Sequence, residues 1–202
     1  MRIFISSYFK THFKTYIDYL DHYWIRYFEK KKYSFQLIPN SLLNSKNLIN
    51  NITKKDLIIL PGGNDILGKN HLFKTRLKIE KDLLSLSIRK KIPLLGVCRG
   101  MQVINNYFGG DIKKIKGHMN TKHPVFIKKR LFRKSKIIVN SFHNYCISPN
   151  NVSKELEILA IDNQSNIEMF KHRKLKILGV MWHPEREKTL KNLDRILKAL
   201  IK

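Results

Sequence analysis

The sequence has few cysteines and no long apolar run. Its two cysteines, Cys98 and Cys146, supply neither the spaced set of a disulfide framework nor the paired Cys/His spacing of a zinc site. Every apolar stretch is shorter than the roughly 18 residues of a membrane span, and the first of them is too short for a signal peptide. We therefore expect a soluble cytoplasmic protein with no membrane partner, folded as one domain over residues 1–202.

Acidic residues are also scarce. Only 15 Asp and Glu stand against 40 Lys and Arg, which gives a formal charge of +25 and makes nucleic acid or a phosphorylated substrate a plausible partner. The lysines are nevertheless spread over most segments, and the densest basic stretch, Lys128–Lys136, is short and resembles the flank of a hairpin or loop. We therefore expect a solvated basic surface, and we do not expect nucleic-acid binding to be the main function.

Apolar runs bounded by turn residues alternate with stretches of helical periodicity. This pattern predicts an α/β fold in which helices cover both faces of a mostly parallel sheet. Strands are expected at residues 3–5, 35–39, 56–60, 136–140 and 177–182, and helices at about 16–31, 74–90 and 190–200.

Cys98 carries the strongest chemical signal. An apolar run, Pro93–Val97, leads into Gly96-Val97-Cys98-Arg99-Gly100, and a helical pattern follows. This is the layout of a nucleophile elbow, in which small residues let the backbone turn sharply beneath the reactive side chain. The helix that follows points its positive end at the thiol, where it stabilises negative charge.

A base for this thiol is expected at His183-Pro184-Glu185. Residues two apart on an extended segment point to the same side, so the Glu185 carboxylate can hold one ring nitrogen of His183 while the other faces the nucleophile. The string alone is more often a strand-end turn. Its place after an apolar strand, in a chain that also has an elbow cysteine, favours the catalytic interpretation.

A glycine-rich turn, Pro61-Gly62-Gly63-Asn64, directly follows the apolar run at residues 56–60. Glycines leave backbone N–H groups unshielded, and sheet geometry can bring this loop beside the elbow. We predict an oxyanion hole made by the N–H groups of Gly63 and Arg99, the latter being the residue after the nucleophile. Taken alone, the Pro-Gly-Gly string would be an ordinary turn.

Together these motifs, PGGND at 61–65, GVCRGMQ at 96–102 and WHPE at 182–185, resemble the class I glutamine amidotransferase and γ-glutamyl hydrolase superfamily. The resemblance covers most of the chain. It implies a flavodoxin-like three-layer sandwich and a Cys98-His183-Glu185 triad. The implied reaction is hydrolysis of a small γ-glutamyl amide through a glutamyl thioester, with no metal or organic cofactor.

Within the superfamily, Arg99, residues 139–144 and residues 182–186 resemble the γ-glutamyl hydrolase side. Residues 19–25 and 37–40 resemble a branch that includes γ-glutamyl-CDP-amidate hydrolases of bacterial surface-polysaccharide pathways. Two alternatives stay open: a glutaminase subunit that passes ammonia to a separate synthase partner, and a non-catalytic binding protein of the same fold. No pattern in the sequence indicates an oligomeric state.

Several other polar residues are candidates for binding or support. The resemblance implies substrate contacts for Gln102 and for the segment containing Asn140, Ser141 and His143, although His143 could equally be a structural histidine bonded to a turn. His118 and His123 are expected to serve a loop, because no carboxylate stands at ligand spacing from them. Glu168 and Asp65 are predicted to support the site or cap a helix, and Cys146 to be a packed thiol.

Overall fold

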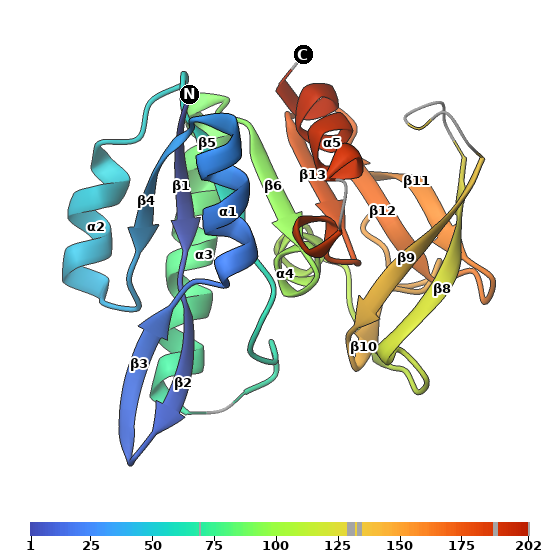
Figure 1. Ribbon diagram of the computed structural model, residues 1–202, viewed down its shortest axis with the longest axis horizontal. Helices are drawn as coiled ribbons and strands as arrows, with labels where there is room; N and C mark the ends of the chain where they lie inside the picture. The colour runs from blue at the N-terminus through green and yellow to red at the C-terminus, as the bar shows by residue number, and fades with distance from the viewer. Residues whose placement is uncertain (69, 129–131, 133–134, 188–189, 202) are drawn as a thin grey trace.

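A nine-stranded sheet organises the computed structural model, which describes residues 1–68, 70–128, 132, 135–187 and 190–201 (Figure 1). The strand order is β4-β1-β5-β6-β13-β12-β11-β8-β9. In this spatial order, the first five strands, β4, β1, β5, β6 and β13, are parallel to one another. The next four, β12, β11, β8 and β9, each run antiparallel to the strand before. The elements are β1 Arg2–Ser6, β2 Tyr8–His12, β3 Thr15–Tyr19, α1 His22–Lys31, β4 Ser34–Ile38, α2 Leu42–Asn50, β5 Leu57–Leu60, α3 His71–Lys90, β6 Leu94–Val97, α4 Arg99–Tyr107, β7 Lys113–Lys114, β8 Met119–Ile127, β9 Lys136–Phe142, β10 Tyr145–Cys146, β11 Leu156–Asp162, β12 Ile167–His172, β13 Ile177–Val180, the 3-10 turn Pro184–Arg186 and α5 Lys191–Ile201.

Helices cover both faces of the parallel half, so the predicted three-layer flavodoxin-like α/β architecture is confirmed. Alternate residues of each strand point to opposite faces, and two separate apolar clusters result. On one face, α1 and α5 pack through residues such as Trp24 and Leu197. On the other, α2, α3 and α4 pack through residues such as Ile49, Leu83 and Ile104. The sequence pattern predicted a mostly parallel sheet. In the structure, the antiparallel strands β12, β11, β8 and β9 extend the parallel part at the β13 edge.

The predicted helix over residues 16–31 is wrong in its first part. Residues 15–19 form β3, which pairs antiparallel with β2 in a hairpin that projects from the body (Figure 1). Phe13 and Lys14, with φ of 46° and 62°, make the tight turn. The helix begins at His22 because the Asp21 side chain caps it, accepting a hydrogen bond from the backbone N–H of Tyr23 at 3.1 Å. The alternation of Thr15, Ile17 and Tyr19 fits a strand as well as the apolar spacing fits a helix.

Helix α2 was not predicted. Although it contains three leucines and an isoleucine, only Ser45 and Ile49 are buried. Ser41 starts it by accepting a hydrogen bond from the backbone N–H of Asn44. A short helix with one buried turn gives a weak periodic signal in the sequence.

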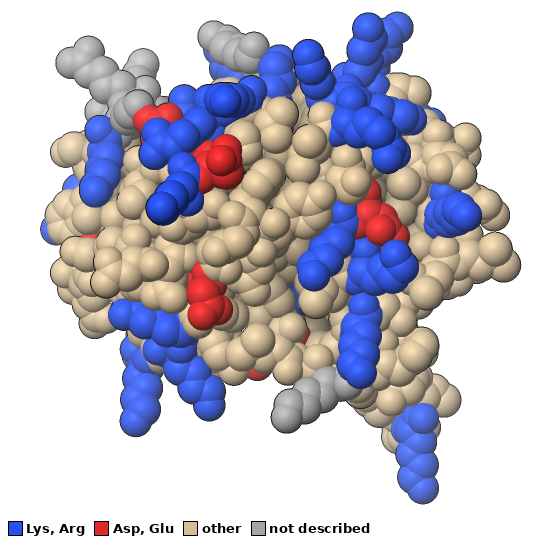
Figure 2. Space-filling view, turned by 180° about the vertical axis from the view of Figure 1, so that it is seen from behind, with Lys and Arg blue, Asp and Glu red and all other residues tan. Residues whose placement is uncertain are grey.

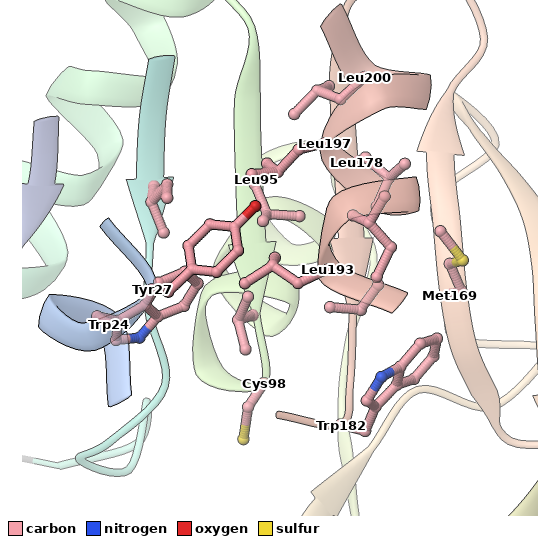
Figure 3. Packing of buried hydrophobic residues seen from close by; sticks show 14 of the residues in the cluster. Trp24, Tyr27, Leu95, Cys98, Met169, Leu178, Trp182, Leu193, Leu197 and Leu200 are labelled. Atoms are coloured by element: carbon pink, nitrogen blue, oxygen red, sulfur yellow. The ribbon is translucent and has the colours of Figure 1, made fainter. Parts of the chain in front are cut away.

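Cys98 lies at the edge of one apolar cluster. In Figure 3 its sulfur points away from Leu95 and the other labelled core side chains, toward the end of the sheet where β6 stops. The packed residues behind it therefore fix the backbone while leaving the sulfur at the rim of the core.

Basic side chains are spread over the face in Figure 2, with few acidic ones between them. The basic stretch Lys128–Lys136 connects the antiparallel strands β8 and β9, although residues 129–131 and 133–134 lie outside the described part of the chain. Among the described residues, no helix combines the length and apolarity needed to cross a bilayer.

Candidate active site

Three neighbouring strands, β5, β6 and β13, end at the same edge of the sheet and carry the residues of the candidate site. The loop Pro61–Asn64 follows β5, Cys98 follows β6, and His183 follows β13. In open parallel sheets, ligands bind at the carboxyl ends of the strands. The fold thus brings together three segments that are far apart in the sequence.

Cys98 occupies a strained turn between β6 and α4. Its φ is 50°, a region that a side chain disfavours, and its N–H donates to the carbonyl of Val180 at 2.7 Å. Gly100 is required because a Cβ there would overlap the carbonyl oxygen of Leu60. The predicted strand-turn-helix elbow is present, with Cys98 at its tip.

His183 and Glu185 are joined by a short hydrogen bond of 2.7 Å between Nδ1 and Oε1. The segment is a 3-10 turn rather than the extended strand we expected, because Pro184 starts a helical turn. The turn still brings the two side chains together, and both are buried. Burial lowers the pKa of His183, but the Glu185 carboxylate and the Cys98 sulfur outweigh this effect and raise it to about 10.

Asn140 holds the backbone of His183. Its side-chain N–H donates to the His183 carbonyl at 2.8 Å, and its Oδ1 accepts from the His183 N–H at 2.9 Å. Ser141 donates its hydroxyl to the carbonyl of His118 at 2.7 Å and is buried. Neither side chain is among those that line the cleft described below. Both side chains thus hold backbone groups inside the protein, and their predicted contacts with a substrate stay predictions.

Both glycines of the loop are required because neighbouring side chains leave no room for a Cβ atom. Gly63 has a φ of +82°, and a Cβ on it would press into the ring of Tyr8. A Cβ on Gly62 would lie 2.5 Å from Cε1 of His183 and 3.4 Å from Cβ of Cys98. The loop backbone thus lies against the cysteine and the histidine, where the predicted oxyanion donors, the N–H groups of Gly63 and Arg99, would be needed.

A buried ionic network, not predicted from the sequence, supports this loop. Arg76 donates to the carbonyls of Gly62 and Pro61 at 2.7 and 3.2 Å and to Asn64 Oδ1 at 2.9 Å. It also pairs with Glu80 at 3.0 Å, and the Arg99 side chain pairs with the other oxygen of Glu80.

This network lies beneath the loop in the interior. The side chains of Arg76 and Glu80 are fully buried. Burial and the neighbouring Arg99 lower the pKa of Arg76 to about 10, which leaves it charged at neutral pH. The only sequence signal was an i,i+4 pair of opposite charges on a helix face that also carries Leu83.

A cleft of about 310 Å³ opens over Cys98 and His183. Gln102 and His143 both line it, as the sequence-based interpretation requires of substrate contacts. Gln102 donates to the carbonyl of Tyr145 at 3.2 Å, and Asp65 stands on the opposite loop. Cys146 is buried in β10, where burial raises the pKa of its thiol. Its setting fits the predicted packed thiol.

Three histidines and a glutamate gather beside this cleft. His118, His143 and Glu168 are buried and the side chain of His123 is 11% exposed, and each of the four offers a ligand atom within 4.8 Å of the others. The expectation that His118 and His123 lack a carboxylate partner is therefore wrong. Glu168 comes from β12, over forty residues away in the sequence, so local spacing could not reveal it.

Comparison with known proteins agrees with this geometry. Residues 15–202 match the family described as glutamine amidotransferase class-I. The fold resembles that of a putative GMP synthase subunit from Thermoplasma acidophilum, with a TM-score of 0.75 and 19% identity over 100% of this chain and 94% of that one. A glutamine amidotransferase from Thermotoga maritima gives a TM-score of 0.66 and 16% identity, over 98% and 81% of the two chains.

Among curated relatives, the chain is 43% identical to the γ-glutamyl-CDP-amidate hydrolase of Campylobacter jejuni, over 70% of this chain and 67% of that protein. It is 29% identical to a glutamine-hydrolysing GMP synthase subunit of Methanococcus aeolicus, over 82% and 84% of the two chains. With a family match over nearly its whole length and a relative at this identity, the chain belongs to the class I glutamine amidotransferase family of enzymes.

Proposed function

We propose that this enzyme hydrolyses a γ-glutamyl amide with Cys98 as the nucleophile. The observation that carries the proposal is the strained Cys98 turn beside His183, whose other ring nitrogen is held by Glu185 at 2.7 Å. In such a triad the carboxylate fixes the tautomer and stabilises the imidazolium. A non-catalytic binding protein would have no need to keep a buried, strained cysteine against a His-Glu pair.

The reaction follows from these positions. Cys98 gives its proton to His183, and its sulfur attacks the γ-carbonyl carbon of the substrate, whose oxygen receives hydrogen bonds from the N–H groups of Gly63 and Arg99. His183 then returns the proton to the leaving nitrogen as the C–N bond breaks. The glutamyl thioester that remains is attacked by water, which gives a proton to His183, and glutamate leaves as the Cys98 thiol is restored.

We further propose γ-glutamyl-CDP-amidate as the substrate. Support comes from the 43% identity to a hydrolase that bears this substrate in its name. The resemblance of residues 19–25 and 37–40 to the same branch supports a role in surface-polysaccharide biosynthesis. Gln102 would contact the glutamyl part from the wall of the cleft, which His143 also lines. A reactive free thiol at Cys98 requires a reducing compartment, so we infer that the enzyme works in the cytoplasm.

A second candidate is a glutaminase subunit that supplies ammonia to a separate synthase. It is favoured by the 29% identity to a GMP synthase subunit over 84% of that protein. The same triad would act on glutamine, and the two candidates differ in substrate and in dependence on a partner. Ammonia release from glutamine that appears only when a synthase is added would favour this candidate.

The test is hydrolysis of a panel of γ-glutamyl amides by the purified protein, with glutamate detected by mass spectrometry. We expect turnover of γ-glutamyl-CDP-amidate without a partner protein, and a loss of at least about 10⁴-fold in Cys98→Ala with substrate binding retained. Cys146→Ala is the matched control, because it removes the other buried thiol, and it should keep its activity. Undiminished turnover in Cys98→Ala would refute the mechanism.

A further inference from the structure

The cluster of His118, His123, His143 and Glu168 contains buried polar atoms with no partner. Nε2 of His123, Nε2 of His143 and both carboxylate oxygens of Glu168 make no hydrogen bond. The Glu168 Oε1 atom lies 3.9 Å from Nε2 of His123 and 3.8 Å from Nε2 of His143, which is too far for a hydrogen bond. Buried polar atoms that converge without bonding are costly unless something lies between them.

The other nitrogen of each ring is already held. Nδ1 of His143 lies 3.0 Å from the carbonyl of Tyr145, and Nδ1 of His123 lies 3.3 Å from that of Pro124. Nδ1 of His118 lies 3.4 Å from Oγ of Ser141, whose own hydroxyl proton goes to the His118 carbonyl. Nδ1 of His143 and Nδ1 of His123 therefore carry the hydrogen, which leaves the Nε2 lone pairs of these two rings free. Nε2 of His118 instead faces Oδ2 of Asp162 at 3.6 Å. Metal-binding histidines are oriented in this way by the groups around them.

We propose that His118, His123, His143 and Glu168 bind a Zn²⁺ ion. Three neutral imidazoles and one carboxylate form a ligand set that zinc favours, and four protein ligands fill a tetrahedral shell as in structural sites. Zinc bonds of about 2.1 Å place tetrahedral ligand atoms about 3.4 Å apart. Small side-chain rotations would close the present separations, which are within 4.8 Å, to that value.

The charges around the cluster also suit a cation. The side chain of Glu168 is fully buried, and its Oε1 atom faces Nε2 of His123 at 3.9 Å and Nε2 of His143 at 3.8 Å. Among the described residues, neither carboxylate oxygen of Glu168 has a hydrogen-bond partner. A divalent ion would supply that partner.

The ion would join β12 to the β8–β9 pair, which the hydrogen bonds of the sheet do not join to it directly. His118 precedes β8, His123 lies within β8, His143 follows β9, and Glu168 lies in β12. His143 also lines the cleft. We therefore assign the ion a structural role, in which it fixes the antiparallel half of the sheet as a wall of the active site, and we assign it no part in bond breaking.

The experiment measures zinc itself. Wild-type protein is stripped with a chelator and titrated with Zn²⁺, and bound metal is quantified by elemental analysis while thermal unfolding is followed. We expect one Zn²⁺ per chain and a rise in the unfolding temperature, because a ligand that binds only the folded state stabilises it. Co²⁺ in place of Zn²⁺ should give the visible absorption of a tetrahedral site without thiolate ligands.

Variants locate the site independently of activity. Glu168→Gln and His123→Ala should each weaken zinc binding by at least about 100-fold, since even loss of a supporting contact costs 10- to 100-fold. His71→Ala, at an exposed histidine that begins α3, is the control and should bind as wild type does. Cys98→Ala should also bind normally. The proposal is overturned if the wild type binds no stoichiometric zinc, if both cluster variants retain it, or if Cys98→Ala abolishes it.

Discussion

Replacing Arg76 by methionine tests whether the buried ionic network holds the oxyanion loop. Arg76 makes four hydrogen bonds between 2.7 and 3.2 Å, and three of them go to the loop residues Pro61, Gly62 and Asn64. Methionine fills much of the same volume and removes all four. Glu80 keeps its pair with Arg99, so the buried carboxylate is not left wholly without a cation.

We expect Arg76→Met to lower the free energy of unfolding by about 3–5 kcal/mol, the cost of breaking a buried ion pair. Displacement of the Gly63 N–H should lower kcat by about 10²–10³-fold, the effect of losing one oxyanion donor. Denaturant unfolding and steady-state kinetics on the γ-glutamyl substrate measure the two effects. Arg76→Lys keeps the charge but not the branched guanidinium geometry, so its stability and its kcat should lie between those of wild type and Arg76→Met. It provides a folded variant if the methionine variant fails to fold.

Lys78→Met is the matched control on the same helix. Lys78 is 62% exposed and pairs with Asp82 at 3.4 Å, so its loss should change stability by less than about 1 kcal/mol. It should leave kcat unchanged, because its side chain faces solvent away from the loop. If Arg76→Met proves as stable and as active as Lys78→Met, the network does not position the loop and the reasoning is refuted.

Two further predictions concern electrostatics. Glu185→Gln should lower the pKa of His183 from about 10, as followed by NMR of the imidazole, and should reduce kcat by about 10⁴-fold; an unchanged pKa would contradict the assigned pairing. The pKa of His183 is raised above its ordinary value of 6.5, so protonated His183 stabilises the fold fully below about pH 6.5, and this stabilisation is lost as the pH rises through about 10. The stability difference between wild type and Glu185→Gln should therefore shrink over that pH window. If the charge of +25 attracts nucleotide phosphates, kcat/KM for a nucleotide-linked amide should fall steeply between about 0.01 and 1 M salt while that for glutamine stays nearly flat, and equal salt dependence would exclude such attraction.

The parts of the site that the sequence predicted are those in which neighbouring residues act together. The elbow around Cys98 and the turn after β5 each need glycine because of their backbone conformation or close packing, and these glycines are visible in the sequence. His183 and Glu185 are two apart, and both the predicted extended segment and the observed 3-10 turn allow their side chains to meet. The order of apolar runs then predicted a parallel sheet, and parallel sheets align strand ends.

The parts that were missed depend on contacts between distant segments. Glu80 pairs with Arg99 across the fold, and Glu168 lies beside three histidines from distant segments; the residues next to each glutamate in the sequence show neither neighbour. The two hydrogen bonds from Asn140 to the backbone of His183 could not be predicted either, because the sequence does not reveal which way a polar side chain near the site points. The β2–β3 hairpin was misread because residues 16–31 satisfy a helical period as well as an alternating one.

The nucleophile, the base and the glycine loop follow β5, β6 and β13, so the antiparallel strands carry none of them, although Asn140 of β9 holds the backbone of His183. Cleft-lining residues such as Met119 of β8 and Phe142 of β9 belong to the antiparallel strands. A chimaera that exchanges those strands with a relative but keeps Asn140 should therefore change its preference for the departing amine while the catalytic residues stay in place. In this architecture, the residues that break the bond and part of the cleft wall that contacts the substrate lie on different strands, so they can change separately.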